Sequence, residues 1–134
     1  MIVVDTNVTA YLWLPGELTA AAERLLGNDP DWAVPLLWRS EFRSVLAGAV
    51  RRKLCRIERA AAIAAAAEDH FMGREFAVES AEVLRLAHES GCSTYDCEFV
   101  ALARTLGAAL VSNDREVLKA FPGVAIPLEN YRTP

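Results

Sequence analysis

Positive charge, histidine and cysteine are all scarce in this chain of 134 residues. Fourteen lysines and arginines stand against eighteen aspartates and glutamates, which gives a formal net charge of −4. A protein that coats nucleic acid through its overall charge would be basic, so that class is excluded. Any binding of phosphate must come from local cationic patches or from bound metal ions.

The few thiols and imidazoles are scattered along the chain. Cys55, Cys92 and Cys97 are odd in number, and their spacing matches neither a disulfide framework nor a zinc site. We therefore predict free thiols in a reducing cytoplasm. His70 and His88 have no second donor at metal-ligand spacing, so we expect both on the surface or at an interface.

Long apolar runs are also absent. No stretch approaches the roughly 18 apolar residues that span a membrane, and Met1 leads into a strand rather than a basic leader. There is no internal repeat or linker, while 53% of the residues are hydrophobic, which argues against disorder. We expect a single cytoplasmic domain over residues 1–134, with no membrane contact.

Predicted strands and helices alternate along the chain. The first strand, at residues 2–4, is fully apolar, as is typical of the centre of a parallel sheet. The alternation predicts an α/β fold whose mainly parallel sheet is covered on both faces. Further strands are expected at 32–34, 75–78, 109–112 and 124–127, and helices at 6–14, 17–26, 37–54, 57–71, 80–89, 94–106 and 114–120.

Two aspartates follow predicted strands. Asp5 comes directly after the first strand, and Asp114 comes just after the strand at 109–112. Because the carboxyl ends of parallel strands meet at one edge of a sheet, we expect both acids at that edge. The alternative for each acid taken alone is a helix N-cap, and Asp114 fits that role directly.

Two more acids lie on apolar helix faces. Glu41 shares its face with Trp38 and Val45, and Asp96 shares its face with Phe99. The alternatives are a buried ion pair for Glu41 and a solvated acid in the first helical turn for Asp96. Glu98 points about 160° away from Asp96 in an ideal helix, so it is at most an outer member of the group.

If these acids converge, their charges must be neutralised. Two carboxylates about 4 Å apart repel by roughly 4 kcal/mol at an effective dielectric of 20, so such a cluster protonates or binds cations. Only oxygen donors are offered, which favours Mg²⁺ or Mn²⁺ over zinc. A metal held in this way suits hydrolysis of phosphodiesters.

Four segments carry a resemblance to a known family. They are residues 4–7 (Val-Asp-Thr-Asn), 40–42 (Ser-Glu-Phe), 95–103 (Tyr-Asp-Cys-Glu-Phe-Val-Ala-Leu-Ala) and 110–114 (Leu-Val-Ser-Asn-Asp). In this order and spacing the chain resembles PIN-domain ribonucleases, most closely the VapC-type toxins of toxin–antitoxin pairs. The resemblance covers essentially the whole length.

The resemblance implies a fold, an activity and partners. The fold would be a three-layer α/β/α sandwich, and the activity Mg²⁺- or Mn²⁺-dependent cleavage of single-stranded or looped RNA. The family also implies a homodimer and a small antitoxin protein that blocks the site. By position, the catalytic and metal-binding acids would be Asp5, Glu41, Asp96 and Asp114, with Thr6, Asn7, Ser112 and Asn113 as supporting polar residues.

Two other protein classes with acidic sites match the sequence less well. A haloacid-dehalogenase-like phosphatase needs a second aspartate two residues after the first, where Asn7 stands. A receiver-type signalling domain needs a phosphoacceptor aspartate in mid-chain and a late lysine, and no convincing pair exists. The serious alternative is a PIN-like module that binds RNA or protein with little or no turnover.

A basic cluster interrupts the otherwise acidic chain between residues 51 and 59. Two interpretations stay open: the cluster guides an RNA backbone toward the acids, or it is a solvated helix end whose charges complement the helix dipole. The three tryptophans are expected in the core or at a dimer interface rather than stacked on bases. The cluster consists of Arg51, Arg52, Lys53, Arg56 and Arg59.

Overall fold

The computed structural model describes all 134 residues and is built on one five-stranded sheet. All strand pairs are parallel and the order is β3-β2-β1-β4-β5, with the first strand at the centre. The predicted parallel sheet is therefore confirmed. The strands are β1 (Ile2–Val4), β2 (Trp32–Pro35), β3 (Glu75–Phe76), β4 (Leu110–Val111) and β5 (Ala125–Ile126).

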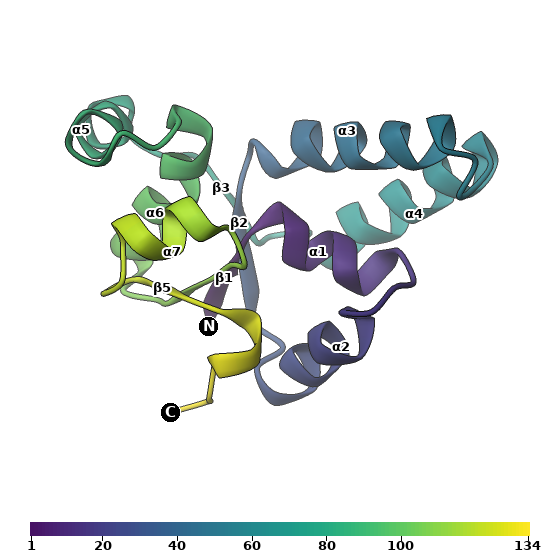
Figure 1. Ribbon diagram of the computed structural model, residues 1–134, viewed down its shortest axis with the longest axis horizontal. Helices are drawn as coiled ribbons and strands as arrows, with labels where there is room; N and C mark the ends of the chain where they lie inside the picture. The colour runs from purple at the N-terminus through teal and green to yellow at the C-terminus, as the bar shows by residue number, and fades with distance from the viewer.

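Helices cover both faces of the sheet. Four of them lie on one side and three on the other, which gives the expected α/β/α sandwich (Figure 1). None of the helices combines the length and the apolar character needed to cross a membrane. The first side carries α1 (Thr6–Trp13), α2 (Thr19–Asn28), α3 (Trp38–Arg51) and α4 (Ile57–His70); the second carries α5 (Ser80–Ser90), α6 (Thr94–Leu106) and α7 (Arg115–Ala120), and a 3₁₀ turn, η1 (Leu128–Asn130), follows β5.

Helix α6 is the most deeply buried helix and has the bounds that the sequence predicts. The Ser93 side chain caps its first turn, and it ends at Gly107, which adopts a left-handed φ of 61°. Six consecutive or near-consecutive residues are buried, from Cys97 to Ala103. A helix that is apolar nearly all round must lie inside the protein, and α6 packs against β1 and β2.

Two predicted helix boundaries are wrong. The helix expected at 17–26 runs instead over Thr19–Asn28, because Gly27 keeps helical geometry and the helix ends at Asp29, before Pro30. The helix expected at 37–54 stops at Arg51, because Lys53 turns into the left-handed region with φ 60°. The remaining differences are of one or two residues at element ends.

The beginning of α3 is fastened to the edge strand β3. The Trp38 indole N–H donates to Glu75 Oε1 at 2.6 Å, and the Arg39 guanidinium donates to both Glu75 oxygens at 2.6 and 2.9 Å. The Arg39 guanidinium lowers the pKa of Glu75. These bonds fix the first turn of α3, which carries Glu41.

The tryptophans belong to the packing of the fold. Trp32 and Trp38 are 1% exposed within a cluster of buried side chains, and Trp13 packs against that cluster. Buried rings cannot stack on bases, so Trp32 and Trp38 are core residues as predicted, while Trp13 is half-buried against the core.

The left-handed glycine at the end of α6 gives a first prediction. Gly107→Ala should lower the free energy of unfolding by about 1 kcal/mol, because an L-residue is strained at φ 61° even though the added Cβ meets no neighbour. Gly27→Ala is the matched control, since Gly27 lies within α2, has no positive φ and has open space around it. The free energy of unfolding of the Gly27→Ala variant should rise by roughly 0.5–1 kcal/mol. Urea titration measures both, and equal effects of the two variants would contradict the argument.

Candidate functional site

Asp5 lies at the carboxyl end of the central strand and is 9% exposed. Its Oδ1 accepts a hydrogen bond from the Thr6 backbone N–H at 2.7 Å, so it caps α1. Its Oδ2 accepts from the Ser112 hydroxyl at 2.7 Å. The side chain is therefore held on both oxygens, yet each oxygen keeps a lone pair for another partner.

Ser112 joins Asp5 to Asp114 across neighbouring strand ends. Its hydroxyl oxygen accepts from the Asp114 backbone N–H at 3.0 Å while its hydrogen goes to Asp5. Asp114 Oδ1 in turn accepts from the Val117 N–H at 3.0 Å, which caps α7. Both aspartates are thus helix caps, as the alternative interpretation held, and both also lie at one sheet edge.

Glu41 reaches the same edge from α3. Its Oε1 accepts from the Thr6 hydroxyl at 2.7 Å, and the carboxylate is half-buried. Glu41 takes part in none of the ion pairs of the structure, so the interpretation as a buried ion pair is wrong.

Asp96 completes the group from the first turn of α6. Its backbone N–H donates to the Ser93 hydroxyl at 3.1 Å, which fixes the turn. The carboxylate is half-buried, and burial raises its pKa more than the Ser93 side chain beside it lowers that pKa. It is therefore only partly solvated.

The pKa shifts indicate that the charges of these acids interact. Burial raises the pKa of Asp5, opposed in part by the Ser112 and Thr6 bonds, and the charge of Asp114 raises it further. Burial raises the pKa of Glu41, and the charges of Asp5 and Asp96 add to that rise. Burial, Asp114 and Asp5 raise the pKa of Asp96. No cation pairs with any of the four.

Glu98 stands at the margin of this group. Its charge contributes to the raised pKa of Glu41, and burial raises the pKa of Glu98 itself. It also lines a neighbouring cleft of about 360 Å³ together with Ser80 and Thr94. That position fits the outer membership that its angle on the helix predicts.

The four predicted supporting residues divide into two pairs. Thr6 and Ser112 donate directly to Glu41 and Asp5. Asn113 instead accepts from the Leu128 N–H at 3.0 Å and thereby holds η1, and the exposed Asn7 makes no side-chain hydrogen bond. Sequence could place these residues near the acids, but only coordinates distinguish the hydroxyls that touch carboxylates.

The donor chemistry fits a hard divalent cation. Carboxylates that are partly desolvated, mutually repelling and free of cations are stabilised when such an ion binds. As the side chains stand, however, no group of three or more histidine, cysteine, aspartate or glutamate residues is arranged to hold an ion together.

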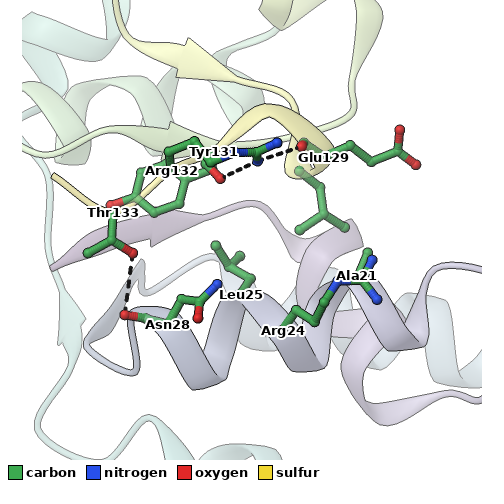
Figure 2. A pocket seen from close by; sticks show the side chains of 9 residues that line it. Ala21, Arg24, Leu25, Asn28, Glu129, Tyr131, Arg132 and Thr133 are labelled. Carbon is green, nitrogen blue, oxygen red and sulfur yellow. Dashed lines mark hydrogen bonds between the residues drawn. The ribbon is translucent and has the colours of Figure 1, made fainter.

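A cavity between α2 and the end of the chain lies away from the four acids. A pocket of about 460 Å³ separates α2 from the C-terminal segment, and none of the four acids lines it. Figure 2 shows Arg24 and Asn28 on α2 facing Tyr131, Arg132 and Thr133. The pocket is filled partly by contacts of the chain end, such as the 3.4 Å bond from the Thr133 hydroxyl to the Asn28 carbonyl. It is therefore separate from the carboxylates.

Comparison with known proteins identifies the family. The model of the family described as "PIN domain" matches residues 2–123, which is most of the chain. The chain belongs to the PIN-domain family. The resemblance seen in the sequence is thereby confirmed.

Individual relatives agree with this placement of the PIN domain. The chain is 31% identical over 131 residues to Ribonuclease VapC3 of Pyrobaculum aerophilum, and the match covers 94% of this chain and 98% of the relative. The crystal structure of PAE2754 from Pyrobaculum aerophilum is 27% identical with a TM-score of 0.71, over 96% of this chain and 90% of that one. FitAcB from Neisseria gonorrhoeae shares the fold at 15% identity with a TM-score of 0.76, over 98% and 100% of the two chains.

The raised pKa values give a second prediction, for protein in EDTA. The pKa of Asp96 is raised above its ordinary 3.8 because the ionised carboxylate is destabilised in the folded protein. The folded protein is therefore most stable, as far as Asp96 is concerned, at low pH, and this stability is lost as pH rises through the raised pKa. Asp96→Asn should therefore melt higher than the unmodified PIN domain by roughly 3 °C at pH 7, with the difference shrinking toward pH 4. Differential scanning calorimetry across this range measures it.

Asp69→Asn is the control for that comparison, since Asp69 is an exposed acid of α4 outside the cluster. Its melting temperature should differ little from that of the unmodified protein at any pH. An Asp96→Asn variant that melts lower at pH 7, or a gain that does not grow with pH, would contradict mutual repulsion among the acids.

Proposed function

We propose that this PIN domain is a Mg²⁺- or Mn²⁺-dependent endoribonuclease that cleaves single-stranded or looped RNA, and that it is the toxin of a toxin–antitoxin pair. The observation that carries the proposal is the set of four interacting carboxylates, Asp5, Glu41, Asp96 and Asp114, without a neutralising cation. A set of that kind has little use in a purely structural role, because it opposes folding.

The choice of RNA as substrate is supported by the relative from Pyrobaculum aerophilum. That protein is a ribonuclease by name, and the match runs over nearly the full length of both chains. Among the proteins that share the fold is a toxin–antitoxin complex from Klebsiella pneumoniae, at 17% identity and a TM-score of 0.64. We infer that the present chain has the same kind of partner, a small antitoxin protein.

The four acids would hold the metal, and the hydroxyls of Thr6 and Ser112 would orient two of them. A bound Mg²⁺ or Mn²⁺ would supply a positive charge that stabilises the negative charge developing on the phosphate. Thr6 donates to Glu41 Oε1 at 2.7 Å and thereby fixes the orientation of this carboxylate. Ser112 holds Asp5 against the repulsion of Asp114 by bonding to both residues.

Unpaired RNA suits a site at a recessed sheet edge. Asp5 and Ser112 are buried, so the scissile phosphate must approach the helix N-termini closely, and a flexible single strand or loop can bend to do so. The first turns of α1 and α7, each headed by one of the aspartates, present backbone N–H groups that favour an anion. A silent module that binds RNA without turnover would not need the desolvated acids.

We also propose a homodimer in the cytoplasm. Leu84 on α5 and Tyr95 on α6 are 62% and 60% exposed, and these helices pack side by side. Large exposed apolar side chains on adjoining helices favour self-association. The three cysteines are free thiols, which fits a reducing compartment.

Removal of one carboxylate tests the enzymatic proposal. Asp5→Asn should lower the rate of RNA cleavage by about a hundredfold or more, or ~2.7 kcal/mol of transition-state stabilisation, because the metal loses a charged ligand. The assay follows a labelled structured RNA with Mg²⁺, with Mn²⁺ and with EDTA. Cleavage should require the metal, and RNA binding by the variant should persist.

Asp69→Asn, the exposed acid of α4, is the matched control and should cut at the normal rate. Cleavage that survives EDTA, or an Asp5→Asn variant as fast as the unmodified enzyme, would overturn the metal mechanism. Failure to cut any member of a total cellular RNA pool would favour the module without turnover.

The dimer proposal is tested by light scattering. The unmodified chain should run near twice its mass of 14.7 kDa. Leu84→Glu should shift it to the monomer at micromolar concentration, because a charge would be buried at the interface. Leu54→Glu, at a residue 71% exposed on a different surface, should leave the dimer intact. A monomeric unmodified protein, or dissociation only by the second variant, would contradict this interface.

A further inference from the structure

The loop between α3 and α4 concentrates positive charge at one end of the molecule. The basic tip, as we name it, consists of Arg51, Arg52, Lys53, Arg56 and Arg59, all of which are exposed. Glu58 is the one acid in residues 51–59, so the tip carries a formal +4. The rest of the chain has nine cationic and seventeen acidic side chains, a formal charge of −8.

The helix dipole explains only part of this cluster. Arg51 lies in the last turn of α3, where cations are favourable. Arg56 is the N-cap residue of α4 and Arg59 lies in its first turn, where the dipole opposes positive charge. The interpretation as a dipole-complementing helix end therefore fails for these two arginines.

Ion pairing does not explain the tip either. Arg56 lies 3.7 Å from Glu58 in a pair that is 90% and 74% exposed, and no other cation of the tip has an acidic partner. By contrast, Arg85 pairs with two glutamates on its own helix at 2.7 and 2.9 Å. The tip thus holds several like charges together, and one exposed ion pair is their only internal compensation.

The tip is connected rigidly to the carboxylates. Glu41 lies in the first turn of α3 and Arg51 at its last residue, so a rise of ~1.5 Å per residue separates them by about 15 Å. Figure 1 shows α3 running from the sheet edge to the outermost loop, where it meets α4. At ~3.4 Å per stacked nucleotide, that distance corresponds to roughly four or five nucleotides.

We propose that the basic tip binds the phosphate backbone of the RNA substrate about 15 Å from the cleaved bond. This proposal rests on the proposed ribonuclease function and specifies the length of substrate that the enzyme engages. An acidic body repels RNA, so the tip provides the local attraction that brings the chain onto its substrate. An acidic protein segment is the rival occupant, but five cations outnumber the two exposed apolar side chains of the tip, Leu54 and Ile57.

The first arm of the test measures binding without cleavage, in the Asp5→Asn background. The test variant adds Arg56→Gln and Arg59→Gln, and the control adds Arg24→Gln and Arg132→Gln, which remove the same charge at the distant pocket in Figure 2. The probe is a single-stranded RNA of about a dozen nucleotides, titrated at several salt concentrations. The tip variant should bind roughly tenfold more weakly, with a salt slope smaller by ~1.4 for two lost phosphate contacts.

The stability of the tip variant separates binding from folding. Because both arginines oppose the α4 dipole, the variant should melt at the same temperature as its parent or higher. If the tip variant and the control bind RNA equally, the RNA proposal is overturned and the acidic-protein rival takes its place. A lower melting temperature would equally contradict the argument from the dipole.

The second arm measures cleavage by the tip variant with Asp5 restored. For the longer RNA, KM should rise about tenfold while kcat stays the same; for a trinucleotide, which cannot reach the tip, both constants should match the control. An equal loss on both substrates would overturn the proposed spacing. If no RNA is cut at all, the ribonuclease function fails, while the binding arm still decides whether the tip holds RNA.

Discussion

Everything at the sheet edge depends on one hydroxyl group that faces two acids. Ser112 donates to Asp5 at 2.7 Å and accepts from the Asp114 backbone at 3.0 Å, so it spans the ends of β1 and β4 with both sides of its oxygen. The parallel pairing of these strands brings the two aspartates into proximity. Without a donor between them, that proximity would be purely repulsive.

The packing of the fold supplies the remaining acids. Helix α6 is buried against β1 and β2, which brings its first turn and Asp96 to the same edge. The bonds from Trp38 and Arg39 to Glu75 fix the beginning of α3. The Thr6 hydroxyl then donates a hydrogen bond to Glu41. Glu41 and Asp96 are thus positioned by helices whose own stability comes from apolar burial or from bonds outside the site.

Much of this arrangement could be predicted from the sequence, for identifiable reasons. The apolar composition of Ile2–Val4 and of α6 is enough to predict that both are buried. Acids placed after buried strands are expected at one edge of the sheet. The resemblance of the four segments to PIN domains supplied the family. The bounds of α2 and α3 could not be predicted well, because they depend on whether Gly27 and Lys53 leave helical geometry.

The hydrogen-bond partners of the polar side chains could not be predicted from the sequence. Asn113 and Ser112 are adjacent, yet one bonds to the 3₁₀ turn at Leu128 and the other to Asp5. An Asp that caps a helix and an Asp that joins an acidic cluster look alike in sequence, and here Asp5 and Asp114 do both. Only tertiary contacts decide between such roles.

The bond between Ser112 and Asp5 also closes a loop of 107 residues, which has a consequence for the order of events during synthesis. The central strand β1 is synthesised well before its neighbour β4 and before the second aspartate. A growing chain therefore carries Asp5 without Asp114 until β4 has been made. The acidic cluster is completed only when β4 docks beside β1.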